Sequence, residues 1–202
     1  MQKLRELAAQ GNADALHRLA KIYLEGVHKD REEAFKNLLQ AAELGLAEAQ
    51  DAIGIMYYIG DGVPEDYDKS FAWHNKAAEQ GNVQALVHVG DMHLCGDGTP
   101  EDVSQAIICY RKAAERGNPE AQWHLGCLYA DGDNVPQDVV EAWKWFSLAV
   151  EASSGTDGQD YYRRSRDELG ALMSPVQIKV AQKLADAMQQ KIDTMKPASS
   201  KA

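Results

Sequence analysis

Cysteine is scarce in this chain of 202 residues. There are three cysteines in all, and an odd number excludes a framework in which every cysteine is paired. They also lack a regular spacing, since they occur at Cys95, Cys109 and Cys127. We therefore expect reduced thiols that pack as small apolar side chains rather than an obligate disulfide bond.

Basic residues and long apolar runs are also in short supply. Lysine and arginine total 21 against 31 acidic residues, which gives a net charge of −10. Such a field repels nucleic acid, so we expect no nucleic-acid partner. No apolar run approaches the roughly 20 residues that cross a bilayer. The opening residues, MQKLRELAAQ, lack the apolar core of a signal peptide. We expect no membrane insertion and a cytoplasmic location.

The common catalytic motifs are missing as well. The sequence contains no GxSxG nucleophile elbow, no phosphate-binding loop and no dinucleotide-binding fingerprint. The short sequences GDG and GDN do recur, but each follows a helix-like segment and is explained as a helix terminator. We therefore expect no catalytic residues, no cofactor and no enzymatic activity.

A period of 36 residues dominates what is present. A fixed period of this size is typical of one supersecondary unit stacked on copies of itself. We expect a single domain over residues 1–195, with repeats at about 11–44, 45–80, 81–116 and 117–153, a C-terminal cap at 157–195 and a disordered tail at 196–202. The period is carried by small residues at Gly45, Gly81 and Gly117, at Gly60, Gly96 and Gly132, and at Ala49, Ala85 and Ala121.

Each repeat has the pattern of a helical hairpin. In the last copy, Ala121, Leu125, Leu128 and Tyr129 fall at i, i+4, i+7 and i+8, which is one face of an α-helix. A glycine and then a proline end this first helix. The second helix follows an aspartate that we expect to be its N-cap. These aspartates are Asp30, Asp66, Asp102 and Asp138.

Glycine also recurs inside the first helix, at Gly54, Gly90 and Gly126. Glycine costs about 1 kcal/mol in a helix interior relative to alanine. Its regular placement there predicts a close approach of the paired helix.

After Val150 the repeat pattern fails, and a polar segment leads to a last long helix. Ser174 and Pro175 predict its start. Along it, one apolar face runs through Val176, Val180, Leu184, Ala187 and Met188. We expect this face to cover the exposed flank of the fourth repeat, as the terminal cap of a repeat protein does.

The pattern AxxxLGxxYxxGxxVPxDxxxAxxWFxxAxE at residues 121–151 resembles the Sel-1-like repeat, a branch of the tetratricopeptide superfamily. The resemblance covers roughly residues 7–153. It implies an all-α, right-handed solenoid of about four hairpin repeats plus capping helices. It also implies an adaptor or scaffold that binds a protein or peptide in a concave groove lined by the first helix of each repeat.

Within each first helix, the residues two, six and nine positions after the repeat alanine lie about 180–240° away from it around the helix. If first helices line the groove, these predicted groove residues form its floor, and an apolar floor suits an amphipathic helix or an extended peptide. The alternative is that neighbouring repeats simply cover some of them. The predicted groove residues are His17, Lys21, Asp51, Ile55, Tyr58, Val87, Asp91, Leu94, Trp123 and Cys127.

Two histidines have the spacing of candidate metal ligands. His88 and His124 occupy equivalent repeat positions, and each is followed three residues later by a potential zinc ligand, Asp91 or Cys127. Packed helices lie near 10 Å apart, which is wide for a closed tetrahedral site. His74 has no spaced partner in the sequence. We expect no metal site.

The leading hypothesis is therefore a monomeric, non-catalytic adaptor that holds a protein or peptide segment. The alternative is an inhibitor or immunity-type protein that blocks a toxin or an enzyme. An enzyme is the third and weakest hypothesis.

Overall fold

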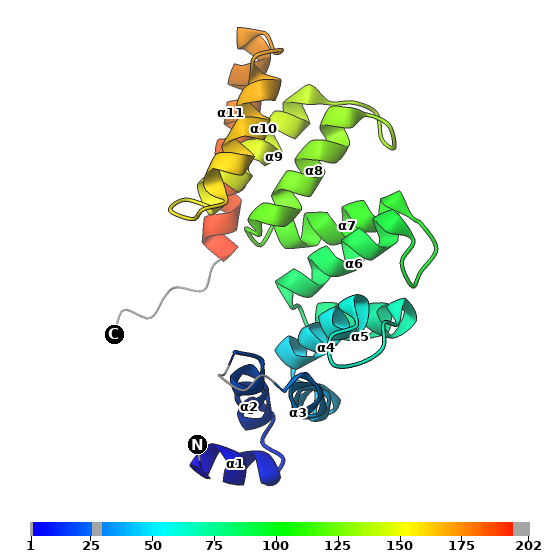
Figure 1. The fold of residues 1–202 in the computed structure, drawn as a ribbon. Helices are drawn as coiled ribbons and strands as arrows, with labels where there is room; N and C mark the ends of the chain where they lie inside the picture. Colours follow the sequence, from blue (N-terminus) through cyan, green and yellow to red (C-terminus); the bar gives the residue numbers. More distant parts are fainter. Residues whose placement is uncertain (1, 26–29, 196–202) are drawn as a thin grey trace, which may run out of the picture. The chain divides into compact units, whose positions relative to one another are not determined.

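The computed structural model describes residues 2–25 and 30–195, and these form eleven helices and no strand (Figure 1). The predicted tail at 196–202 lies outside the described residues. The all-α class and the repeated helical hairpins predicted from the sequence are confirmed. The helices are α1 (Gln2–Ala9), α2 (Ala13–Glu25), α3 (Arg31–Glu43), α4 (Ala47–Ile59), α5 (Tyr67–Glu79), α6 (Val83–Cys95), α7 (Val103–Ala114), α8 (Pro119–Asp131), α9 (Val139–Ala152), α10 (Gln159–Gly170) and α11 (Pro175–Met195).

The chain divides into two compact units, Met1–Asp102 and Val103–Ala202. The first unit contains α1 to α6 and the second contains α7 to α11. The division falls between α6 and α7, so the two helices of the third repeat belong to different units. The single domain over residues 1–195 stays a prediction.

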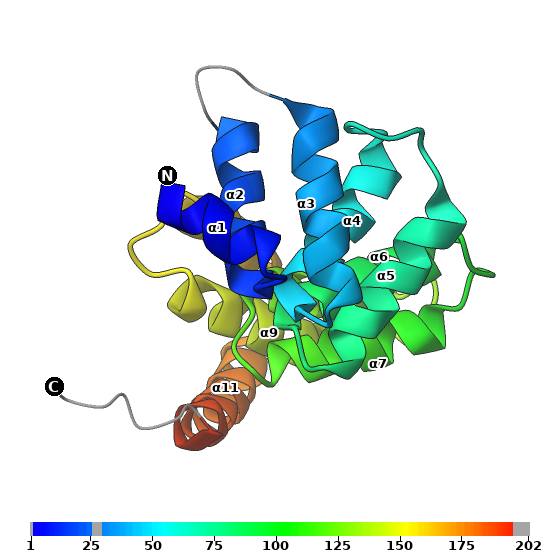
Figure 2. The same cartoon turned by 90° about the horizontal axis from the view of Figure 1, so that it is seen from below.

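In the first unit, each helix packs against the next one along the chain, and Figures 1 and 2 both show α2 and α3 side by side. The core is made of small and aliphatic residues of the repeat, including Leu19, Leu38 and Ile53. The predicted N-caps are confirmed at Asp30 and Asp66, whose carboxylates accept hydrogen bonds from backbone N–H groups of the first helical turn.

Close helix approach at the interior glycines is confirmed in both units. A Cβ added at Gly54 would lie 2.7 Å from the imidazole of His74, and one added at Gly126 would overlap the ring of Phe146. Gly54 and Gly126 are equivalent positions, and so are His74 and Phe146. In the second and fourth repeats, the second helix of the hairpin therefore presses a ring against a glycine of the first helix.

The second unit packs α7 against α8 and α8 against α9, while α10 and α11 both pack against α9. The large buried side chains of this unit include Tyr110 on α7 and Trp145 and Leu148 on α9. The predicted N-cap at Asp138 is confirmed.

The predicted inner face of α11 is wrong. Val176, Val180 and Leu184 are 71%, 46% and 43% exposed. The buried side chains on α11 are instead Ala181, Ala185 and Ile192. Small alanines let α11 approach α9 closely, and so the stripe with less apolar surface is the one that packs.

Candidate functional site

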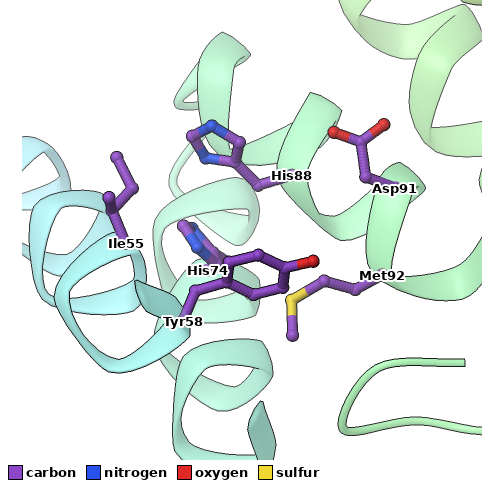
Figure 3. Close-up of a pocket in the computed structure, with 6 residues that line it drawn as sticks. All are labelled: Ile55, Tyr58, His74, His88, Asp91 and Met92. Carbon is purple, nitrogen blue, oxygen red and sulfur yellow. The ribbon is translucent and has the colours of Figure 1, made fainter. Parts of the chain in front are cut away.

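A cavity of about 240 Å³ opens in the first unit among α4, α5 and α6. Figure 3 shows the two imidazole rings beside this pocket, with Ile55 and Tyr58 approaching from α4. Ile55 and Tyr58 are 39% and 38% exposed, so both remain accessible to a partner. The lining residues are Ile55, Tyr58, His74, His88, Asp91 and Met92.

Two of these lining residues, His74 and His88, belong to a cluster of three polar side chains, one from each helix. Asp51 of α4 receives two hydrogen bonds on a single carboxylate oxygen, Oδ1. The Nδ1 atom of His74, from α5, lies 2.7 Å from it, and the Nδ1 atom of His88, from α6, lies 2.9 Å from it. Because an ionised carboxylate only accepts, each Nδ1 carries the proton that it donates. We call these three residues the Asp51 cluster.

Burial controls the ionisation of the cluster. Burial alone would raise the pKa of Asp51, but hydrogen bonds from His74 and His88, with their positive charge when protonated, outweigh it and lower that pKa to about 2. Burial lowers the pKa of His74, and the hydrogen bond to Asp51 offsets this only in part. At neutral pH the cluster therefore holds an ionised carboxylate and a neutral His74.

Tyr58 is held at the rim of the pocket by its neighbours. Its hydroxyl donates a 2.8 Å hydrogen bond to the carboxylate of Asp97, and its ring lies 5.1 Å from the ring of Tyr67. The hydrogen bond to Asp97, assisted by partial burial, raises the pKa of Tyr58 to about 12. A side chain fixed in this way loses little conformational freedom when a partner packs on it.

The first unit places the predicted groove residues in different environments. Ile55, Tyr58 and Asp91 line the pocket together. Asp51 and Val87, two positions after the repeat alanine, are 8% and 0% exposed, so their predicted exposure is wrong. A helix that packs on more than one side buries more than one stripe.

The remaining predicted groove residues of this unit lie outside the pocket. Leu94 and His17 are half-buried, and Lys21 is exposed. Burial, with the neighbouring charge of Lys21, lowers the pKa of His17. Their role in binding stays a prediction.

In the second unit, Trp123 is partly covered by α10. Its Nε1–H donates to the hydroxyl of Ser165 at 3.1 Å, and its ring lies 5.2 Å from that of Tyr161. Cys127 is half-buried, and burial raises the pKa of its thiol to about 12. Trp123 is thus part of the packing of the second unit, and its role as an anchor for a partner stays a prediction.

Sequence reasoning missed His74. Its repeat position is held by Leu38, Tyr110 and Phe146 in the other copies, so a histidine there is a polar exception at an apolar position. This exception, rather than any spacing between histidines, is the feature of the sequence that indicates a special role for His74. The structure brings His74 to Asp51 and to His88, so one of the histidines weighed for zinc in the sequence, His88, lies in a three-residue cluster with partners that its spacing did not indicate.

Among the residues that the structure describes, no helix combines the length and the apolar character needed to cross a bilayer. A model of the Sel1 repeat matches the chain four times, at residues 13–46, 47–82, 83–118 and 119–154. No curated protein matches the chain.

Three solved bacterial proteins have folds similar to this one. A protective antigen of uropathogenic Escherichia coli strains, described as displaying an SLR fold, has a TM-score of 0.82 and 30% identity over 98% of this chain and 43% of that one. A Sel1 repeat protein from Oxalobacter formigenes has a TM-score of 0.75 and 26% identity over 96% of this chain and 55% of that one. The chain thus spans about half the length of these two proteins. An immunity protein from Pseudomonas aeruginosa shares the fold at 18% identity, with a TM-score of 0.53 over 95% of this chain and 71% of that one.

Proposed function

The chain belongs to the Sel1 repeat family, and we propose that it is a non-catalytic module that binds a protein or peptide segment at the pocket formed by α4, α5 and α6. Repeat proteins of this type generally act through extended surfaces that bind other proteins. The observation that carries the proposal is the accessible apolar rim made by Ile55 and Tyr58 over a preformed cavity. Concave apolar sites with a few polar groups are the usual place for a ligand.

The size and the charge of the site favour one kind of partner. A cavity of about 240 Å³ has room for one large apolar side chain rather than for a whole helix. Asp91 lines the pocket and Asp97 lies at its rim beside Tyr58, in a chain with a net charge of −10. We therefore expect an apolar anchor residue flanked by lysine or arginine, because complementary charge speeds association and selects partners.

Peptides selected from a random library on the immobilised wild-type chain test this proposal. The variant Ile55→Asp places a charge at the pocket, while Ile59→Asp makes the same change on α4 at a residue that is 60% exposed and does not line the pocket. We expect the enriched peptides to share an apolar anchor and to bind Ile59→Asp as they bind the wild type. Their affinity for Ile55→Asp should be at least about tenfold lower, because anchors in desolvated pockets dominate binding. Equal binding to Ile55→Asp, or no enrichment, would count against the proposal.

A second candidate is an inhibitor of a toxin or an enzyme, supported by the fold shared with the Pseudomonas aeruginosa immunity protein. Such a partner is a folded protein, and a stable complex of that kind buries about 2,000 Å² or more. Substitutions far from the pocket, such as Lys21→Glu, would then weaken binding as much as Ile55→Asp. An effect confined to Ile55→Asp favours the pocket and argues against this candidate.

A further inference from the structure

Two buried polar residues in the first unit, His74 and Asp51, stand at positions where other repeats have apolar residues. Where His74 presses against Gly54, the fourth repeat places Phe146 against Gly126. Where Asp51 stands, the next repeat has the fully buried Val87. The fold therefore accepts apolar residues at both positions, and the polar pair is not required for packing.

A buried polar cluster of this kind is poorly explained by stability. Removing a carboxylate and an imidazole from water costs several kcal/mol, and replacing buried ion pairs by apolar residues is often neutral or stabilising. His74 is 2% exposed and Asp51 is 8% exposed, so the Asp51 cluster bears most of that cost. A ligand that needs these groups gives a reason for their presence.

The geometry matches the needs of a metal ion. One ligand atom from each of Asp51, His74 and His88 lies within 4.8 Å of the others. The two nitrogens lie 2.7 and 2.9 Å from the carboxylate oxygen. With metal–ligand distances of about 2.0–2.1 Å, neighbouring ligand atoms are about 2.9 Å apart in an octahedral site and about 3.3 Å apart in a tetrahedral one. Small shifts of the side chains therefore make room for an ion among the three atoms.

We propose that Asp51, His74 and His88 bind one divalent transition-metal ion of the zinc class. Two imidazoles and one carboxylate are a typical ligand set for such ions, and they leave a coordination position open. This set excludes the harder ions magnesium and calcium, which prefer oxygen ligands.

Metal ligands must be an ionised carboxylate and neutral imidazoles. The Nδ1 atoms of both histidines already face the same carboxylate oxygen of Asp51. The ion takes the place of the two Nδ1 protons, which then reside on Nε2. For His88, the side-chain amide of Gln84 lies 3.5 Å from Nε2, so its oxygen, after rotation of the amide, can accept that proton and orient the ring.

The pocket provides both an entrance and the open position. His74 and His88 line the cavity, and the side chain of His88 is 24% exposed, which leaves a path for the ion. The fourth ligand is a water molecule, or a donor group of whatever fills the cavity. The metal site does not depend on the proposed peptide partner, because Zn²⁺ alone is sufficient to test it.

Equilibrium dialysis of the untagged chain against Zn²⁺, with the bound metal measured by mass spectrometry, gives the stoichiometry. Cysteine competes for zinc, so the test uses a variant with Cys95, Cys109 and Cys127 all changed to alanine beside the natural chain. We expect one zinc per chain in both. Substitution with Co²⁺ adds a visible absorption band whose intensity reports the coordination geometry.

The matched pair of variants is His88→Ala and His124→Ala. The two histidines occupy equivalent repeat positions, but His124 stacks on Tyr110 at 4.8 Å, where no comparable ligand set is found among the described residues. We expect His88→Ala, which removes a ligand, to weaken zinc binding by at least about 100-fold. Gln84→Ala removes only a residue that can hydrogen-bond to this ligand, and it should weaken zinc binding about tenfold. His124→Ala should bind as the parent does.

Two further variants separate loss of a ligand from loss of the fold. Asp51→Val and His74→Phe introduce residues that the chain itself uses at equivalent positions, Val87 and Phe146. Both should keep the helical circular dichroism of the wild type and lose the zinc. Binding of zinc that survives in His88→Ala and Asp51→Val, or no binding in the wild type, would overturn the proposal.

Discussion

Replacing Asp51 with valine in metal-free protein measures how strongly the Asp51 cluster depends on its carboxylate. The pKa of Asp51 falls from 3.8 to about 2 in the folded chain. Each pKa unit corresponds to about 1.4 kcal/mol, so the environment of the carboxylate stabilises the folded unit by about 2 kcal/mol at neutral pH. This stability is fully present above pH 3.8 and is lost as the pH falls towards 2.

The substitution also leaves a buried donor without its acceptor, since His74 Nδ1–H then has no carboxylate to bind. A buried unsatisfied donor costs about 1–3 kcal/mol, and this overlaps with the loss counted from the pKa. We expect Asp51→Val to lower the free energy of unfolding by about 2 kcal/mol in urea titrations followed by circular dichroism with a chelator present. The m-value should not change, because the surface exposed on unfolding is similar.

The double variant Asp51→Val with His74→Phe supplies the control. Each single change removes one half of the hydrogen bond between Asp51 and His74 and leaves the other half buried. The double variant removes both halves, and the two apolar residues pack as they do elsewhere in the chain. The double variant should therefore be at least about 1 kcal/mol more stable than the sum of the two single changes predicts. Additivity within about 0.3–0.5 kcal/mol would refute the view that Asp51 and His74 act as a pair.

Three further predictions concern pH, turns and the last helix. Burial lowers the pKa of His74 below 6.5, so the unfolded chain takes up a proton before the folded chain does as the pH falls. The free energy of unfolding, measured with a chelator present, should therefore decline below about pH 6.5. His74→Phe should flatten this decline. Gly98→Ala should lower the free energy of unfolding by at least about 2 kcal/mol, because φ is +64° and the new Cβ overlaps the backbone of α5. Gly45→Ala, where φ is +93° and the space around the new Cβ is open, should lower it by about 1 kcal/mol in the same urea assay. Ile192→Asp, at 2% exposure, should lower the thermal midpoint by several degrees, while Val180→Asp, at 46%, should change it little.

The repeat made most of the fold predictable. Small residues at a constant spacing of 36 located the hairpins, and the aspartates that begin the second helices are N-caps at Asp30, Asp66 and Asp138. The predicted helix ends at Gly60 and Gly132 are left-handed C-caps with φ of 69° and 75°. These features are local, because a cap or a turn depends on the few residues around it.

The last helix was predicted less well because its packing is not local. Two stripes run along α11, one through Val176, Val180 and Leu184 and the other through Ala181 and Ile192. Hydrophobicity favours the first stripe. The second packs because small side chains allow closer approach between helices, and no repeat copy was available for comparison at this end of the chain.

The candidate site required the fold as well as the repeat. Asp51 was predicted as a surface residue and is buried, while Ile55 and Tyr58 from the same helix line the pocket. Around the helix, Ile55 and Tyr58 are rotated from Asp51 by only about 40° and 20°. Such rotations are smaller than the uncertainty of a helix face assigned from sequence alone. Which neighbour covers a given stripe depends on helix packing angles that the pattern of one helix does not contain.

Polar exceptions are the more useful guide to function in a repeat chain. A residue type shared by several copies is explained by the packing that those copies share, as with the glycines at Gly54 and Gly126. His74 has no such explanation, because an apolar residue fills its position in each of the other copies and the fold tolerates it there. A buried polar residue at such a position costs free energy that the architecture does not require. His74 lies beside an accessible cavity and is hydrogen-bonded to the buried Asp51, and this is therefore where a ligand is most reasonably sought.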